Sequence, residues 1–274
     1  RYRRSHHQEI QLIQNRERFV DANVVQLNTV KSKFQALVIL YDLTDIRRVE
    51  QMQLDFVSNV SHELKTPVTA ITGFAETLLA GAKDDPETLQ QFLKIIYEES
   101  TRLTALIQDI LALSHLDRQD QTQAQDIALK AMVTANLELM QQKIQQKEIH
   151  VSVNIPETLT FKTQKMKLNQ VLKNLIANGI TYNKQAGSLV IAAQVDHQQL
   201  IIRVVDSGLG IPSDLQERIF ERFYRVDQAR ATHKSGTGLG LAIAKEITES
   251  IGGQLTVESQ LGVGSQFILT FPLT

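Results

Sequence analysis

The sequence predicts a multidomain chain that contains a short β-rich N-terminal segment, an all-α antiparallel helical hairpin and an α+β sandwich. Three observations predict this fold class. Apolar residues alternate through residues 9–45, which is the period of strands. From Asp45 the apolar period becomes helical and runs through two long stripes. Strands and helices then mix in one run of about 150 residues, as in a sheet covered by helices.

Composition bounds the function before any motif is considered. The 274 residues carry 29 basic and 30 acidic side chains, for a formal net charge of -1, which excludes a generally basic nucleic-acid binder. The chain has no cysteine, so disulfides, thiolate metal sites and cysteine nucleophiles are excluded. Its 42% of hydrophobic residues is enough for a packed core.

Residues 1–45 are predicted to form a separate N-terminal segment, in which residues 9–45 form three antiparallel strands. So few residues make a poor independent core, so this is either a small sheet that leans on another part or the end of a truncated domain. Residues 1–18 hold five arginines against two glutamates. A basic cluster of this kind fits equally a segment just inside a membrane helix, in the cytoplasmic part of a longer protein, and an ordinary solvated terminus.

Residues 46–118 are predicted to form the helical hairpin. A first helix over about residues 46–80, with Asp45 as N-cap, carries one apolar stripe that includes Val57, Val60, Leu64 and Val68. A turn at 81–85 leads to a second helix over 86–117, for which Pro86 suits the first turn. Such a hairpin exposes too much apolar stripe as a monomer, which predicts a homodimeric four-helix bundle.

Residues 119–126 are polar and lack an apolar period, which predicts a linker before a domain at 127–274. Within that domain the pattern predicts helices at 127–146, 165–182 and 239–251, and strands at 149–155, 188–195, 199–205, 254–259 and 265–272. The mixture is that of an α+β sandwich.

The first candidate for chemistry is residues 61–67, which read SHELKTP inside the first helix. His62 and Thr66 fall opposite the apolar stripe and are predicted to face solvent. The zinc-protease motif His-Glu-x-x-His fails because Thr66 occupies its last position. What remains is either a bystander or an imidazole whose Nδ1 proton can pass to a carboxylate while Nε2 acts as nucleophile.

The second candidate is a set of four short pieces in the last 110 residues. Asn174 and Asn178 share a helix face, where amide oxygens can bind a hard cation such as Mg²⁺. Asp206 ends an apolar strand and opens the glycine loop 206–210, where a carboxylate can accept an exocyclic N–H and glycine admits a planar ring. The glycine run 236–241 precedes an apolar helix, so its N–H groups can face phosphate oxygens.

Each piece alone also has an ordinary structural explanation as a turn, a cap or a packing contact, and their order and spacing carry the signal. The Walker loop and the dinucleotide fingerprint do not fit either glycine run, and the protein-kinase His-Arg-Asp and Asp-Phe-Gly motifs are absent from the sequence. The pieces therefore outline a nucleotide site of another kind.

These motifs resemble those of bacterial sensor histidine kinases. Residues 56–67 (FVSNVSHELKTP) resemble the H box, and residues 174–182, 206–210, 220–225 and 236–241 are similar to the N, G1, F and G2 boxes in the family's order. Residues 9–45 look like the last strands of a PAS sensor domain. The resemblance implies a dimeric hairpin domain that carries the phospho-accepting His62, and a catalytic domain of the Bergerat fold.

The resemblance also implies roles for individual residues. Glu63 would be the base for phosphotransfer, and Thr66 would position water when the protein dephosphorylates its partner. Asn178, assisted by Asn174, would bind Mg²⁺, Tyr182 would pack on the base of ATP, and Asp206 would bind the adenine amino group. Arg222 and Arg225 would serve the phosphates or the domain contact, and 226–237 would be the ATP lid. The implied nucleotide site comprises Asn174, Asn178, Tyr182, Asp206, Gly208, Gly210, Arg222, Arg225, Gly236, Thr237, Gly238, Gly240 and Leu241.

The sequence therefore predicts an ATP-dependent protein-histidine kinase that passes its phosphoryl group to the receiver domain of a response regulator. As the cytoplasmic portion of an inner- or plasma-membrane sensor, it would join the membrane through a missing N-terminal region. One departure from the family pattern keeps an alternative open. Thr181 stands where the family usually has a phosphate-facing lysine, and Gly179 weakens its helix by roughly 0.5–1 kcal/mol relative to alanine. The alternative is a nucleotide-binding regulatory scaffold or a phosphatase-biased protein with weak kinase activity. Tight ATP binding with no phosphoprotein, restored by Thr181→Lys, would favour the scaffold.

Overall fold

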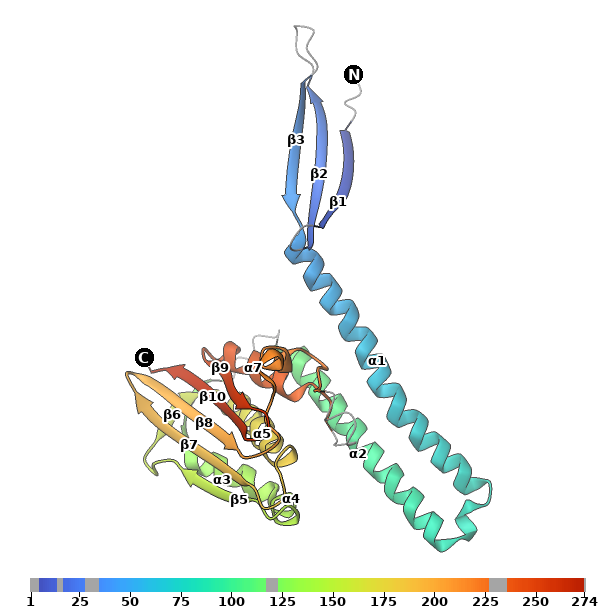
Figure 1. Cartoon of the computed structure of the whole chain (residues 1–274), viewed down its shortest axis with the longest axis vertical. Coiled ribbons are helices and arrows are strands. Elements are labelled where there is room, and N and C mark those ends of the chain that lie inside the picture. The colour runs from blue at the N-terminus through green and yellow to red at the C-terminus, as the bar shows by residue number, and fades with distance from the viewer. Residues whose placement is uncertain (1–4, 14–16, 28–34, 117–122, 227–235, 274) are drawn as a thin grey trace. The chain divides into compact units, whose positions relative to one another are not determined.

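The structure is a computed structural model that describes residues 5–13, 17–27, 35–116, 123–226 and 236–273 (Figure 1). The chain divides into two compact units, Arg1–Glu63 and Leu64–Thr274. The helix α1 (Thr44–Leu79) begins in the first unit and ends in the second. Each unit is therefore described by itself.

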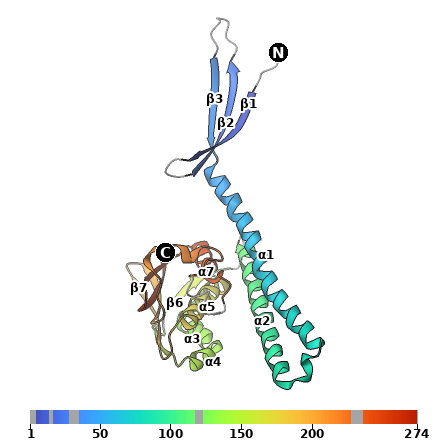
Figure 2. The same cartoon turned by 45° about the vertical axis from the view of Figure 1, so that its right-hand side comes forward.

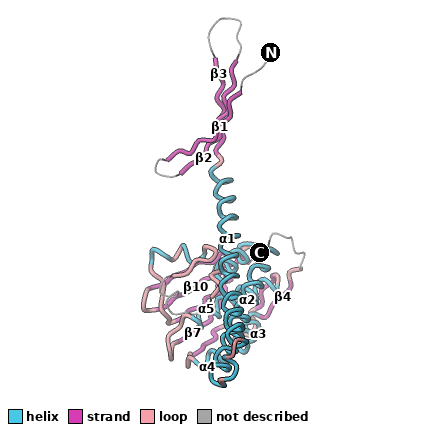
Figure 3. Tube along the Cα trace, turned by 90° about the vertical axis from the view of Figure 1, so that its right-hand side faces the viewer, coloured by secondary structure: helices cyan, strands magenta, loops and turns pink. Residues whose placement is uncertain are grey.

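The first unit opens with a three-stranded antiparallel sheet. Its strands are β1 (Ser5–Ile13), β2 (Glu17–Leu27) and β3 (Gln35–Asp42), in the order β1-β2-β3, which confirms the three predicted strands (Figure 3). Residue Val24 of β2 stands opposite Val38 of β3. Apolar side chains of β3 remain exposed, with Leu40 at 63% of its full exposure. A sheet of this size is thus half solvated, as expected for so short a segment.

The start of α1 differs from the predicted cap. The carboxylate of Asp42 accepts the N–H of Thr44 at 2.9 Å, and the Thr44 hydroxyl accepts the N–H of Phe19 at 3.1 Å. Asp45 lies within the first turn, where a negative charge favours the helix dipole. The prediction of Asp45 as N-cap was wrong because the capping carboxylate stands three residues earlier, at the end of β3.

The helical hairpin is confirmed nearly to its predicted ends. After α1, the turn η1 (Ala82–Asp84) leads into α2 (Pro86–Leu116), whose first turn is capped by Asp85 as it accepts the N–H of Thr88 at 3.1 Å. Within the second unit, the ring of Phe74 in α1 packs against Phe92 in α2, with centroids 4.9 Å apart. Figure 2 shows α1 and α2 joined at one end by the short turn. Large apolar side chains stay exposed along the hairpin: Val68, Leu79, Leu93, Tyr97, Ile107 and Leu111.

The C-terminal domain is built on a five-stranded sheet. Its strands are β5 (His150–Asn154), β7 (Ser188–Asp196), β8 (Gln199–Asp206), β10 (Gly264–Pro272) and β9 (Gln254–Gln260), in that spatial order. Strand β5 is parallel to β7, and the other pairs are antiparallel. In the central strands β8 and β10 alternate residues are buried, so this part of the sheet has one covered face.

Helices cover that face of the sheet. They are α3 (Leu129–Leu139), α4 (Gln141–Gln146), α5 (Lys165–Thr181) and α7 (Gly240–Ser250), with the short turns η2 (Ser213–Leu215) and η3 (Arg218–Phe220) beside them. Fully buried side chains from both layers form the core, and they include Leu168, Leu172, Leu175, Ile176, Leu189, Ile191, Ile202, Ile243 and Leu269. Each contributes roughly 1.5–3 kcal/mol by leaving water. The predicted α+β sandwich is confirmed.

Two parts of this domain differ from the prediction. A single helix was expected at 127–146, but the strand β4 (Gln125–Ala128) precedes α3 and α4. Strand β4 pairs with β6 (Thr160–Thr163), which was not predicted. The first residues of β4 also fall inside the predicted linker 119–126, of which residues 119–122 lie outside the described part. Both strands have only four residues, too few to display a period.

Across the described residues, no helix combines the length and the apolar character that crossing a bilayer requires.

Candidate functional site

The residues of the SHELKTP segment lie where helical periodicity places them. His62 and Thr66 are exposed on α1, Glu63 is half-buried, and Pro67 is buried inside the helix. The expectation that the imidazole faces solvent is confirmed. A side chain that accepts a phosphoryl group must be accessible to a second reactant, and an exposed imidazole on a helix meets this requirement.

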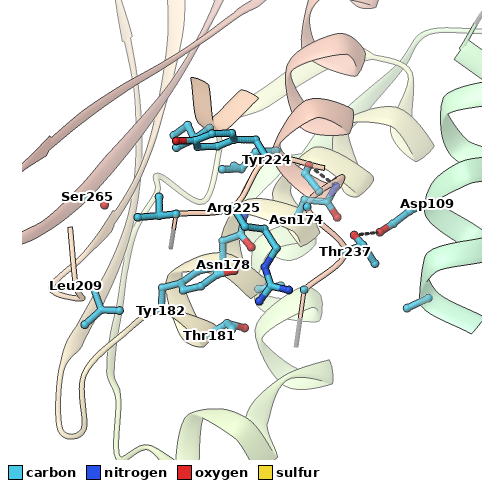
Figure 4. A pocket seen from close by; sticks show the side chains of 18 of the residues that line it. Asp109, Asn174, Asn178, Thr181, Tyr182, Leu209, Tyr224, Arg225, Thr237 and Ser265 are labelled. Carbon is cyan, nitrogen blue, oxygen red and sulfur yellow. Dashed lines mark hydrogen bonds between the residues drawn. The ribbon is translucent and has the colours of Figure 1, made fainter. Parts of the chain in front are cut away.

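The nucleotide-type motifs meet around one cavity of about 920 Å³ in the second unit (Figure 4). Predicted site residues that line it are Asn174, Asn178, Tyr182, Asp206, Gly210, Arg225, Gly236, Thr237, Gly238, Gly240 and Leu241. They come from α5, from the end of β8 and from the loops on either side of residues 227–235. Residues separated by up to 67 positions in the sequence therefore line the same cavity.

The two asparagines of α5 have different surroundings. The helix buries Leu168, Leu172 and Leu175 on its inner face, which leaves Asn174 and Asn178 half-buried at the cavity. The amide of Asn174 donates to the carbonyl oxygen of Gly240 at 2.9 Å and accepts from Gln170 at 3.3 Å. It therefore braces α5 against the start of α7.

The side chain of Asn178 makes no hydrogen bond to any described residue, so its amide oxygen is available to a ligand. No cluster of three acidic or histidine side chains that could hold a metal occurs within the described residues. Mg²⁺ commonly keeps several waters and binds through one or two protein oxygens together with substrate phosphates. The donor set is compatible with that mode, because Asn178 offers a free amide oxygen while the amide of Asn174 is engaged with Gly240.

A lysine outside the motifs fixes the end of α5. The ammonium group of Lys147 donates to the carbonyl oxygens of Ile180 at 2.7 Å and Thr181 at 2.5 Å. These are among the last carbonyls of the helix, which have no intrahelical partner and carry the negative end of the helix dipole. Lys147 thereby holds the turn from which Tyr182 enters the cavity, and sequence reasoning missed this contact because it joins distant segments.

Asp206 owes its position to the alternation of β8. Leu200, Ile202 and Val204 point into the core, and the same period places the carboxylate of Asp206 inward at the end of the strand. One carboxylate oxygen accepts the N–H of Gly208 at 2.8 Å. Burial raises the pKa of Asp206, while the backbone hydrogen bonds from Gly208 and Ser265 lower it. An inward carboxylate with a further free acceptor position can bind an amino group.

Gly208 shapes the site without lining the cavity. A Cβ atom at this position would lie 2.3 Å from the carbonyl oxygen of Tyr182, so only glycine lets the loop pack against the end of α5. The N–H of Leu209 then bonds to the same carbonyl oxygen at 3.2 Å. The predicted glycine loop thus packs against the end of α5 and brings Asp206 and Tyr182 to neighbouring sides of the cavity.

The F and G2 segments contact one another directly. The N–H of Phe223 donates to the carbonyl oxygen of Gly238 at 2.9 Å, and Phe223 itself has a φ of 65°. A non-glycine residue in this region is strained, and such strain concentrates at functional sites. Figure 4 shows Arg225 extending into the cavity toward Tyr182. Most of the predicted ATP lid, residues 227–235, lies outside the described residues.

Arg222 is the one predicted arginine that does not line the cavity. Its exposed guanidinium pairs with Glu246 of α7 at 2.9 Å. The role that the resemblance implies for Arg222, at the phosphates or at the domain contact, stays a prediction.

Several lining residues were not predicted. An apolar group, Leu209, Ile211, Ile219, Tyr224 and Phe267, supplies a wall that could pack on a planar ring. Polar residues of α2, among them Glu98, Glu99, Arg102 and Asp109, form another wall. Leu209 and Tyr224 lie inside the predicted G1 and F segments, although no role was assigned to them. The other apolar residues carry no motif, and the α2 residues belong to a different predicted domain.

Gly179 was expected to weaken α5 relative to alanine, but the structure gives it a packing role. A Cβ atom there would lie 2.7 Å from a terminal methyl group of the fully buried Leu189. We expect Gly179→Ala to lower the stability of this domain by about 1 kcal/mol, because overpacking costs about 1–3 kcal/mol and helix propensity returns about 1 kcal/mol. Thermal unfolding measures it.

The matched control is Gly73→Ala, at an exposed position inside α1 where an added Cβ meets no atom within 4 Å. That change should raise the melting temperature of its transition, since it gains helix propensity without a clash. An equal rise for Gly179→Ala would contradict the packing role.

Comparisons with known proteins agree with this geometry. The sequence model of the family described as "His Kinase A (phospho-acceptor) domain" matches residues 52–119, and that described as "Histidine kinase-, DNA gyrase B-, and HSP90-like ATPase" matches residues 163–274. The chain is 35% identical over 245 residues to the sensor histidine kinase WalK of Bacillus subtilis. The chain belongs to the sensor histidine kinase family. The resemblance drawn from the five boxes is confirmed.

Solved histidine kinases share this fold. The kinase AdeS of Acinetobacter baumannii superimposes with a TM-score of 0.64 at 26% identity, over 78% of this chain and 98% of AdeS. The kinase ThkA, in complex with the response regulator protein TrrA, gives a TM-score of 0.66 at 25% identity, over 97% of this chain and 78% of that one. The alignment with WalK covers 86% of this chain and 39% of WalK, so the chain spans well under half of that curated relative.

Proposed function

We propose that this chain transfers the γ-phosphoryl group of ATP to His62 and then to an aspartate of a response-regulator receiver domain. The observation that carries the proposal is the convergence of Asn178, Tyr182, Asp206 and the glycine run 236–241 on one cavity. The same chain exposes His62 within the segment that matches the phospho-acceptor family.

The cavity offers contacts for the base and for the phosphate groups of ATP. Asp206 accepts the exocyclic amino group of adenine, and Tyr182 packs on the ring. The N–H groups of residues 236–241 and the guanidinium of Arg225 bind phosphate oxygens. Asn178 holds Mg²⁺ against the phosphates. When bound, Mg-ATP supplies the phosphoryl group, with the metal neutralising charge on the phosphate oxygens.

His62 carries the covalent step. Its Nε2 forms a bond to the γ-phosphorus as the bond from that phosphorus to the bridging oxygen breaks, and ADP leaves. Glu63, the next residue, takes the Nδ1 proton, so that the imidazole does not retain a positive charge. The phosphoryl group then passes from Nε2 to a carboxylate oxygen of the receiver aspartate, which restores the imidazole.

The receiver domain is also the substrate of the reverse activity. The response-regulator complex solved for the relative ThkA supports a partner of this class. Thr66, exposed on the helix that carries His62, would position water for hydrolysis of the phosphoaspartate. The kinase and phosphatase activities would thus share one exposed stretch of α1.

Exposed apolar side chains on the hairpin support a homodimer. Leu79 retains 78% of its full exposure and Tyr97 retains 73%. Other exposed apolar residues of the hairpin are Val68, Leu93, Ile107 and Leu111. Pairing with a second hairpin into a four-helix bundle would bury these groups. A PAS-like origin of the N-terminal sheet and a cytoplasmic position below a membrane segment remain predictions of the sequence.

Incubation of the purified chain with γ-labelled Mg-ATP tests the function. We expect covalent label that is lost in acid and persists in base, because a P–N bond to imidazole hydrolyses in acid. ATP labelled on the α-phosphate is the control and should leave no label. Nucleotide binding without covalent label would instead support the nucleotide-binding scaffold.

A further inference from the structure

One contact joins the helical hairpin to the glycine run of the nucleotide site. The hydroxyl of Thr237 donates to a carboxylate oxygen of Asp109 on α2 at 2.7 Å, across 128 residues of sequence (Figure 4). The same hydroxyl oxygen accepts the N–H of Leu239 at 3.2 Å. A threonine hydroxyl has a single hydrogen, so Asp109 takes the only donor that this side chain can offer a ligand.

The contact lies at the site where an anion is best stabilised. Helix α7 begins at Gly240, and its first N–H groups together with the glycine run present positive partial charge. Phosphate groups bind at such termini, and a carboxylate is an anion of similar hydrogen-bonding character. Through the Thr237 hydroxyl, Asp109 therefore places an anionic oxygen beside the glycine run, where a phosphate oxygen of a bound nucleotide would compete for the same donor.

The α2 wall as a whole carries more negative than positive charge. Glu98, Glu99 and Asp109 all line the cavity, and Arg102, at 3.6 Å from Glu99, is the cation of that wall among the described residues. A nucleotide triphosphate is itself a polyanion. Like charges in a partly desolvated cavity repel more strongly than in water, so a docked α2 disfavours a triphosphate more than a neutral nucleoside.

The contact is also poised to be replaced. Burial raises the pKa of Asp109, whereas the hydrogen bond from Thr237 and the charge of Lys173 on α5 lower it. The carboxylate thus loses hydration that its partners do not fully restore. A ligand with several phosphate oxygens can satisfy the same donors while Asp109 returns to water.

We propose that Asp109 is an internal competitor for the phosphate groups of the nucleotide. With α2 docked on the glycine run, Asp109 occupies the anion position and lowers the affinity for triphosphates. Triphosphate binding in turn releases α2 from the start of α7. The inference rests on the proposed nucleotide site, and it adds to that site a residue that lies outside all five boxes.

The affinity of Mg-AMP-PNP, a non-hydrolysable analogue, tests the competition by isothermal titration calorimetry. We expect Asp109→Asn, which removes the charge at nearly constant shape, to bind Mg-AMP-PNP about three- to tenfold more tightly. Adenosine, which has no phosphate, should bind both proteins equally. Glu138→Gln, at an exposed position on α3, is the matched loss of one negative charge and should change neither affinity.

A distance measurement tests the release of α2 without relying on affinity. Because the chain has no cysteine, spin labels can be placed on Gln108→Cys in α2 and Glu249→Cys in α7, both exposed positions. Mg-AMP-PNP should lengthen or broaden the distance distribution of the otherwise native pair. Asp109→Asn should do the same without nucleotide.

The outcomes separate this inference from the proposed function. Unchanged Mg-AMP-PNP affinity in Asp109→Asn, with normal adenosine binding, would overturn the competition and leave the nucleotide site intact. A distance distribution that neither Mg-AMP-PNP nor Asp109→Asn alters would also overturn it. If the native chain binds neither adenosine nor Mg-AMP-PNP, the nucleotide site itself is refuted, and the competition with it.

Discussion

Replacing His62 by glutamine is expected to abolish the acid-labile label formed from γ-labelled Mg-ATP. Glutamine has a similar reach and favours helix, but its amide nitrogen is not a nucleophile. Loss of the attacking atom should reduce labelling by at least about 1,000-fold, as for other enzymes whose nucleophile is removed. Because His62 is exposed, the substitution creates no cavity and leaves the nucleotide cavity unchanged.

Two controls make the result specific. His150→Gln, at an exposed position on β5, changes a histidine outside both candidate sites and should retain full labelling. Binding of Mg-AMP-PNP should be equal in His62→Gln and in the native chain, which shows that the loss lies in the chemical step. Persistent label on His62→Gln would move the acceptor to another residue and remove the main support for the proposed mechanism.

The helical and strand elements could be predicted wherever the sequence shows a sustained period. The stripes of the hairpin predicted α1 and α2 to within a few residues, since each repeats over many turns. Strands β4 and β6 have four residues each and no such repeat, so one was read as helix and the other was missed. Local chemistry misled at Asp45, because the carboxylate that bonds at the helix start is the equally local Asp42.

The candidate site likewise contains residues that local sequence predicts and contacts that it does not. Asn178, Tyr182 and Asp206 could be predicted because a helix face and a strand end fix their directions from nearby sequence. The contacts of Lys147 with the end of α5 and of Asp109 with Thr237 join segments that are 33 and 128 residues apart. No local pattern encodes them, since they depend on how separate elements pack.

Asp206→Asn is expected to give the second large effect, a loss of adenosine affinity of roughly 10- to 100-fold. The reason is that hydrogen bonds to a charged group contribute about 1.5–3 kcal/mol. An asparagine that accepts the Gly208 N–H through its oxygen must present its amino group to the adenine amino group, and two donors then face each other. Asp214→Asn, at an exposed position, is the matched control and should leave the affinity unchanged.

The pH dependence of adenosine binding follows from the same carboxylate. Burial raises the pKa of Asp206 above the ordinary aspartate value of about 3.9. Below the raised pKa the group is protonated and loses its charge-assisted acceptor, so affinity should fall as the pH falls through that pKa. The fall should begin at a higher pH than an ordinary aspartate would give, and it should be absent from Asp206→Asn.

Base preference separates this role from general damage to the fold. Inosine carries an oxygen acceptor where adenosine has its amino group, so the amide donor of Asp206→Asn can pair with inosine. Asp206→Asn should therefore lose affinity for adenosine but not for inosine. Calorimetry at neutral pH should show that the ratio of adenosine affinity to inosine affinity falls. An equal loss for both nucleosides would instead assign Asp206 a structural role at the end of β8, and the adenine contact would pass to another residue of the cavity.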